Sequence, residues 1–69
     1  MKLTEVKNRL KAIVDKSDDD EYAHIMEDDL LHDFIAAIKN GSYQSIDEVV
    51  EVATEVYKTR NIEFGRWYA

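Results

Sequence analysis

The chain contains no cysteine, so neither a disulfide framework nor a zinc–thiolate site is available to it. Those are the usual supports of very small secreted domains, and a reducing cytoplasm is therefore the expected location. No apolar run approaches the roughly 20 residues that cross a membrane, and no basic segment leads into an apolar one. At 69 residues, the chain is expected to form one small domain with a thin hydrophobic core.

Proline is also absent, and glycine occurs only at Gly41 and Gly65, so little in the sequence interrupts long helices. The first apolar stripe recurs at helical spacing, and it consists of Leu3, Val6, Leu10, Ile13 and Val14. This spacing predicts a first helix over residues 3–16.

A second helix is predicted over residues 18–39, with Ser17 as its N-cap. The aspartates that follow Ser17 suit the positive end of the helix dipole. No breaker follows until Asn40-Gly41, a pair that favours a left-handed helix stop. Its apolar arc is made of Ala23, Met26, Leu30, Phe34, Ala37 and Ile38, extended on one side by Leu31 and Ile35.

The sequence Ser45-Ile46-Asp47-Glu48 has the form of a capping box and predicts a third helix over residues 46–60. Its apolar stripe contains Ile46, Val49, Val52, Ala53, Val56 and Tyr57. The remaining segment, 61–69, is too rich in aromatic residues for a dangling end, so we expect it to dock, with at least one ring either packed inside or offered to a partner. The predicted fold is all-α, a three-helix domain closed by an aromatic tail.

Charge is distributed unevenly along the chain. Nine acids and one base, Lys16, occupy the nineteen positions from 15 to 33, which gives this block a net charge of −8 against −6 for the whole chain. Clustered lysine and arginine would be needed to bind phosphates, so direct nucleic-acid binding and anionic membranes are disfavoured. A basic protein partner fits this surface best. Because a thin core gains from burying a shared helix face, a homodimer is also compatible with the sequence.

One acid breaks the pattern of the second helix. Glu27 falls inside the apolar arc, between Phe34 and Ile38 in angle. A buried carboxylate without a partner is costly, so it should protonate or recruit a cation. We predict a structural ion pair between Glu27 and Arg60 or Arg66, or a hydrogen bond to a tail amide.

The two histidines allow a different interpretation. His24, Asp28 and His32 follow one another at four-residue spacing, but the histidines are about 12 Å apart along a helix, too far to share one metal ion. A small-ligand or divalent-metal regulator centred on His24, Glu27 and Asp28 is the alternative function, and solvated surface histidines are the simpler interpretation. No phosphate loop, cysteine nucleophile or Ser-His-acid arrangement is present, so no enzyme activity, catalytic residue or cofactor is predicted.

Ala23-His24, Glu27-Asp28 and the ending Ile62-x-Phe64-x-Arg66-Trp67 together resemble small uncharacterised proteins of phages and bacteria. In that group a His-x-x-Glu-Asp helix precedes an Asp-Phe-x-Arg-Trp ending. The similarity spans about residues 19–69, with Glu63 in place of the aspartate and Tyr68 where cysteine is common. The resemblance implies a small soluble factor of phage type and a contact between helix and tail, and it implies no activity.

The expected function is a non-enzymatic module that binds a host protein, of the nucleic-acid-mimic or anti-defence type. Its partner-binding residues are predicted to be Asp20, Glu21, Asp28, Asp29, Asp33 and Trp67. Such a surface would attract its partner electrostatically, although acidic side chains also serve solubility alone.

Overall fold

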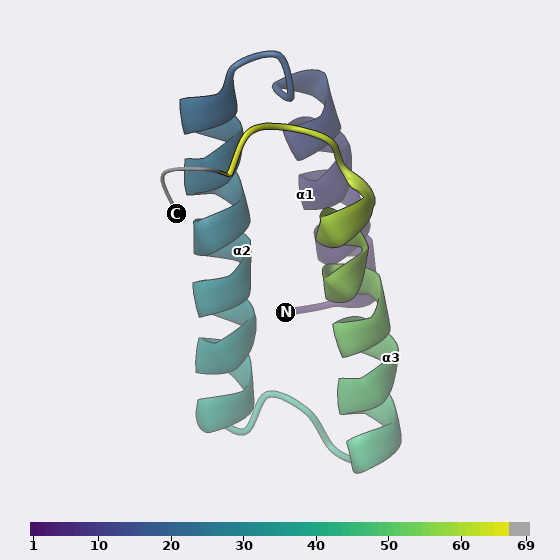
Figure 1. The fold of residues 1–69 in the computed structure, drawn as a ribbon. Helices are drawn as coiled ribbons and strands as arrows, with labels where there is room; N and C mark the ends of the chain where they lie inside the picture. Colours follow the sequence, from purple (N-terminus) through teal and green to yellow (C-terminus); the bar gives the residue numbers. More distant parts are fainter. Residues whose placement is uncertain (67–69) are drawn as a thin grey trace.

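Three α-helices and one short 3-10 helix make up the described part of the chain, residues 1–66, of this computed structural model. The elements are α1 (Leu3–Asp15), α2 (Asp20–Lys39), α3 (Ile46–Val56) and the 3-10 helix η1 (Tyr57–Asn61). Figure 1 shows α2 and α3 side by side, with α1 behind them. The predicted all-α, three-helix fold is confirmed. No helix in residues 1–66 is both long and apolar enough to cross a membrane.

The core lies where the three helices face one another. Its fully enclosed side chains are Val6 and Ile13 from α1 and Leu30 from α2. The rest of the buried cluster comprises Leu10, Ala23, Val52 and Val56. Partly buried side chains from the ends of the chain, including Met1, Ile62 and Phe64, pack against this cluster. A core this small depends on its terminal segments as well as on its helices.

The start of α2 differs from the prediction. Ser17 is not the N-cap, because its hydroxyl donates to the carbonyl of Val14 at 2.8 Å and so belongs to the end of α1. The N-cap is Asp19, whose carboxylate accepts from the amide of Tyr22 at 3.1 Å. The helix therefore begins at Asp20, two residues later than predicted, because the carboxylate of Asp19 satisfies the amide that would otherwise lack a partner.

The end of α2 follows the prediction from Asn40-Gly41. Gly41 has a φ of +74°, the left-handed conformation that glycine adopts without strain. The amide of Gly41 donates to the carbonyl of Ile38 at 3.1 Å, and the amide of Ser42 donates to the carbonyl of Ala37 at 3.0 Å. These two bonds form a Schellman motif, which stops the helix and turns the chain towards α3.

Helix α3 begins with the predicted Ser45 cap and ends early, and the Glu48 side chain of the predicted capping box reaches the amide of Gln44 instead of that of Ser45. The hydroxyl of Ser45 accepts from the amide of Glu48 at 3.2 Å, and the carboxylate of Glu48 accepts from the amide of Gln44 at 2.9 Å. The predicted helix over 46–60 is α-helical only to Val56 and continues as the tighter η1. Bonds of the 3-10 type bring the last carbonyls within reach of the tail, which explains the change of geometry.

Beyond η1, the chain crosses from α3 back to the first turns of α2 (Figure 1). Phe64 on this crossing is partly buried against the core, and the amide of Gly65 donates to the carboxylate of Asp20 at 2.8 Å. The predicted docking of the aromatic tail also involved Trp67 and Tyr68, which lie outside the described residues.

Candidate functional site

The carboxylate of Glu27 is held inside the fold rather than at its surface. Glu27 sits on the inward face of α2, one turn before Leu30, and only 8% of the residue is exposed. The same 3.6-residue period that buries Ala23 and Leu30 carries Glu27 into the interior. A carboxylate in this place requires a cation with matching hydrogen-bond geometry.

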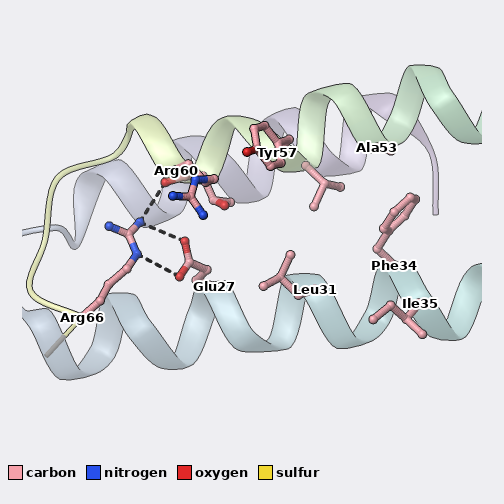
Figure 2. A pocket seen from close by; sticks show the side chains of 10 residues that line it. Glu27, Leu31, Phe34, Ile35, Ala53, Tyr57, Arg60 and Arg66 are labelled. Carbon is pink, nitrogen blue, oxygen red and sulfur yellow. Dashed lines mark hydrogen bonds and ion pairs between the residues drawn. The ribbon is translucent and has the colours of Figure 1, made fainter. Parts of the chain in front are cut away.

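Arg66 supplies that cation from the other end of the chain. Its Nε donates to Oε1 of Glu27 at 3.1 Å, and its Nη2 donates to Oε2 at 2.9 Å (Figure 2). The same Nη2 lies 2.9 Å from the carbonyl of Thr59 and 3.1 Å from that of Ile62. The hydrogen bond with Glu27 raises the pKa of Arg66, although burial acts in the opposite direction. One guanidinium thus joins α2, η1 and the crossing segment.

Of the partners that the sequence left open for Glu27, Arg66 is the one the structure pairs with it. The Arg66 guanidinium also stacks over the ring of Phe64, 3.8 Å from its centroid. Arg60 lies instead 5.7 Å from the centroid of the Tyr57 ring. The predicted pairing of Glu27 with Arg60 is therefore not made, because Arg66 occupies both carboxylate oxygens.

All five predicted partner-binding acids on α2 are exposed, but two of them also hold the fold together. The carboxylate of Asp33 accepts from Nη1 of Arg9 at 2.8 Å and so links α2 to α1. Asp20 accepts from the amide of Gly65. Replacing either one would remove a contact between elements as well as change the surface. Trp67, the remaining predicted partner-binding residue, lies outside the described part of the chain.

The other three acids surround one exposed apolar side chain, Ile25, and Tyr22 lies beside them. Ile25 is 48% exposed and Tyr22 is 47% exposed. Glu21, Asp28 and Asp29 lie three or four positions from Ile25, which makes them its neighbours on the helix surface. We call the surface formed by Glu21, Tyr22, Ile25, Asp28, Asp29 and His32 the outer face of α2.

Sequence reasoning named the acids of this face and overlooked Ile25 and Tyr22. A signal was present for Ile25, which falls on the side of the helix opposite Leu30 and Phe34. Tyr22 lies nearer to the end of α1, with Nζ of Lys16 5.7 Å from the centroid of its ring. A surface with an apolar centre and a charged rim is the usual arrangement of a protein-binding site. The structure thus adds two anchor candidates to the acidic surface.

The residues of the alternative metal site do not converge. Nε2 of His24 lies 3.3 Å from the carboxylate of Asp28, whereas the carboxylate of Glu27 points inward to Arg66. Within residues 1–66, no three histidine, cysteine or acidic side chains are grouped so that they could hold a metal ion. On this part of α2, a contact between His24 and Asp28 lies beside the buried ion pair of Glu27 and Arg66.

A groove of about 510 Å³ lies between α2 and α3. Leu31, Phe34 and Ile35 line it from α2, and Ala53 and Tyr57 line it from α3 (Figure 2). The Glu27–Arg66 pair closes one end of the groove. Towards the other end, a second hollow lies between Ile38 and Ile46.

Several side chains that the sequence assigned to the core lie exposed beside this groove. Ile35 is 64% exposed, Ile46 76% and Tyr57 68%. The apolar arcs of α2 and α3 are wider than the strip that their neighbours can cover, so the edges of both arcs face outwards. We call the surface formed by Leu31, Ile35, Ile38, Ile46, Val50 and Tyr57 the α2–α3 face.

No known protein family, curated protein or solved structure matches this chain. The function must therefore be argued from the surfaces of the molecule itself.

Proposed function

We propose that this protein is a non-enzymatic interaction module that binds a basic protein partner through the outer face of α2. The observation that carries the proposal is the exposure of Ile25 in the middle of Glu21, Asp28 and Asp29. Ile25 and Tyr22 would supply the apolar contact, and the three carboxylates would attract and orient the partner.

The partner class that suits this face best is a nucleic-acid-binding protein. Its basic channel normally receives phosphates, and a row of carboxylates can occupy the same channel. A small factor of phage type that blocks a host or defence protein would act in this way. The chain's own charge of −6 disfavours direct binding of the chain to nucleic acid.

The first experiment is affinity capture from the native host cell, followed by titration of the captured protein. The test variant carries Glu21→Gln, Asp28→Asn and Asp29→Asn, and it spares Asp20 and Asp33 because they hold the fold. The matched control carries Asp15→Asn, Glu51→Gln and Glu63→Gln, three exposed acids away from the outer face. The test variant should lose the partner while the control keeps it, and equal capture by both would refute the proposal.

The second experiment separates the electrostatic from the apolar contribution. Affinity should fall at least tenfold between ionic strengths of about 0.05 M and about 0.5 M, because the carboxylates are exposed and screened by salt. Ile25→Ala should weaken binding at both ionic strengths, because its contact does not depend on charge. An affinity that does not change with ionic strength would contradict the proposed mimicry of phosphates.

A further inference from the structure

The α2–α3 face gathers six of the exposed large apolar side chains of residues 1–66, and the proposed function uses none of these six. Leu31, Ile35 and Ile38 contribute from α2, and Ile46, Val50 and Tyr57 contribute from α3. Each is between 38% and 76% exposed. Exposed apolar side chains gathered on two neighbouring helices of a small domain are typical of an interface.

We propose that the α2–α3 face binds a second copy of this chain, in an antiparallel two-fold arrangement with α2 against α2 and α3 against α3. A two-fold interface is isologous, so each residue meets a residue of the same face on the other copy. The face must therefore be complementary to itself in shape and in charge.

The charges beside α2 satisfy that requirement. Asp28 and Lys39 are both exposed on the same flank of the face, near opposite ends of its apolar stretch. In an antiparallel pair, Asp28 of each copy would meet Lys39 of the other. The two-fold axis would then cross α2 midway between these two positions. Leu31 of each copy would then lie against Ile35 of the other.

The charges beside α3 lead to the same axis independently. Asp47 and Glu51 stand on the outer flank at its beginning, and Lys58 stands on that flank just beyond its end. Antiparallel pairing brings the acids of one copy to the lysine of the other, with Val50 opposite Tyr57. The axis then crosses α3 near Ala53 and Thr54, where small side chains allow close approach.

The two crossing points lie at the same level of the molecule. The groove places Leu31, Phe34 and Ile35 of α2 opposite Ala53, Val56 and Tyr57 of α3. Hence the position at which the axis crosses α2 and the position at which it crosses α3 lie at the same height along the helices, within one helical turn. Within one copy, Asp28 already contacts His24 at 3.3 Å and Lys58 contacts Glu55 at 3.0 Å. In each pair one side chain is largely covered, His24 at 15% and Glu55 at 14% exposed, whereas Asp28 and Lys58 are about half exposed and can turn towards the other copy.

The dimer is tested by sedimentation of the purified chain over a range of concentrations, with no partner present. Wild-type protein should be dimeric at millimolar concentration, and Ile35→Glu should be monomeric throughout while retaining its helical circular dichroism. Ile25→Glu is the matched control, since it makes the same change on the same helix at the outer face, and it should remain dimeric. A wild-type chain that stays monomeric at millimolar concentration would overturn the proposal.

A charge exchange tests the arrangement without relying on an apolar-to-charged change. Asp28→Lys alone and Lys39→Asp alone should each weaken the dimer about three- to tenfold, because each contact occurs twice. The double variant should recover the wild-type dissociation constant, because the reversed pair forms again. Failure of the double variant to recover would exclude this register.

Cysteine placement tests the direction of the helices, since the natural chain has no cysteine of its own. Thr54→Cys should crosslink to its own copy because it lies near the axis. Asp47→Cys should not crosslink, because position 47 of one copy would lie about 20 Å from position 47 of the other. Equal crosslinking at both positions would overturn the antiparallel arrangement. The Ile25→Glu and Ile35→Glu variants also separate this proposal from partner binding, which only the first should abolish.

Discussion

Glu27 and Arg66 lie 39 positions apart in the chain and share two hydrogen bonds inside the fold. Their contact fastens the crossing segment to α2, and the same arginine engages the carbonyls of Thr59 and Ile62. This pair therefore decides how the end of the chain closes the groove between α2 and α3.

Glu27→Gln should lower the free energy of unfolding by about 1–3 kcal/mol, because it leaves the guanidinium of Arg66 without a charged partner. Asp28→Asn, its neighbour on the exposed side, should cost less than about 0.5 kcal/mol. Urea titration measures both. In a double-mutant cycle with Arg66→Met, the coupling energy should exceed about 1 kcal/mol. Similar small costs for Glu27→Gln and Asp28→Asn would contradict the role of the pair.

Two adjacent leucines should respond very differently to truncation. Leu30 is fully buried, whereas Leu31 is 38% exposed beside the groove. Leu30→Ala should cost about 3 kcal/mol because it leaves a cavity in the core, and Leu31→Ala should cost less than about 1 kcal/mol. The comparison requires urea titrations at low protein concentration, so that self-association does not contribute. A larger loss at Leu31 would mean that α2 is rotated relative to this structure.

Substitution of Gly41 should lower stability because of the left-handed backbone conformation alone. A Cβ at this position would meet no atom within 4 Å, so steric conflict with neighbours is absent. Gly41→Ala should nevertheless destabilise the fold by about 1 kcal/mol, and Gly41→Asn should cost less because asparagine tolerates this conformation better. Ser42→Ala, at the next exposed position, is the control and should leave the melting temperature unchanged.

Tyr43 should make stability fall at alkaline pH. Its hydroxyl donates to the carbonyl of Met1 at 2.9 Å, and burial, with smaller contributions from Glu48 and Glu5, raises its pKa above the ordinary value of 10.0. A raised pKa in the folded state means that the fold favours the neutral phenol. This contribution is fully present below the ordinary pKa and is lost as pH rises through the folded value.

The measurement is the free energy of unfolding of wild type and Tyr43→Phe between neutral pH and the alkaline range above pH 10. The wild type should lose stability more steeply than the variant over that window, and the two profiles should converge at its upper end. Tyr57→Phe, at a ring that is 68% exposed, serves as the control and should follow the wild type. Parallel profiles for wild type and Tyr43→Phe would contradict the assignment.

Local chemistry made most of the helix boundaries predictable. The Asn40-Gly41 stop and the Ser45 cap are decided by residues within a few positions of one another, and both occur as expected. The start of α2 was misplaced because Ser17, Asp18 and Asp19 are all acceptable caps in isolation. Two bonds distinguish them: the hydroxyl of Ser17 donates to the carbonyl of Val14, and the carboxylate of Asp19 accepts from the amide of Tyr22.

The candidate site was less predictable than the fold. The acids of α2 were visible as a charge block, but their division into structural and outward-facing members depends on Arg9 and Gly65, which approach from other elements. The exposed side chains Ile25 and Tyr22 lie outside the predicted apolar arc of α2, so helical periodicity alone assigns them no role.

The sequence alone determined that the chain forms three helices and that its acids gather between positions 15 and 33. It also determined that Glu27, inside an apolar arc, needs a cation or hydrogen-bond donor as its partner. It could not choose between Arg60 and Arg66, because both arginines follow α3 at reachable distances. Tertiary structure made that choice by bringing the crossing segment over the start of α2. It also decided which apolar edges remain uncovered, because three short helices can enclose only the strip along which they meet.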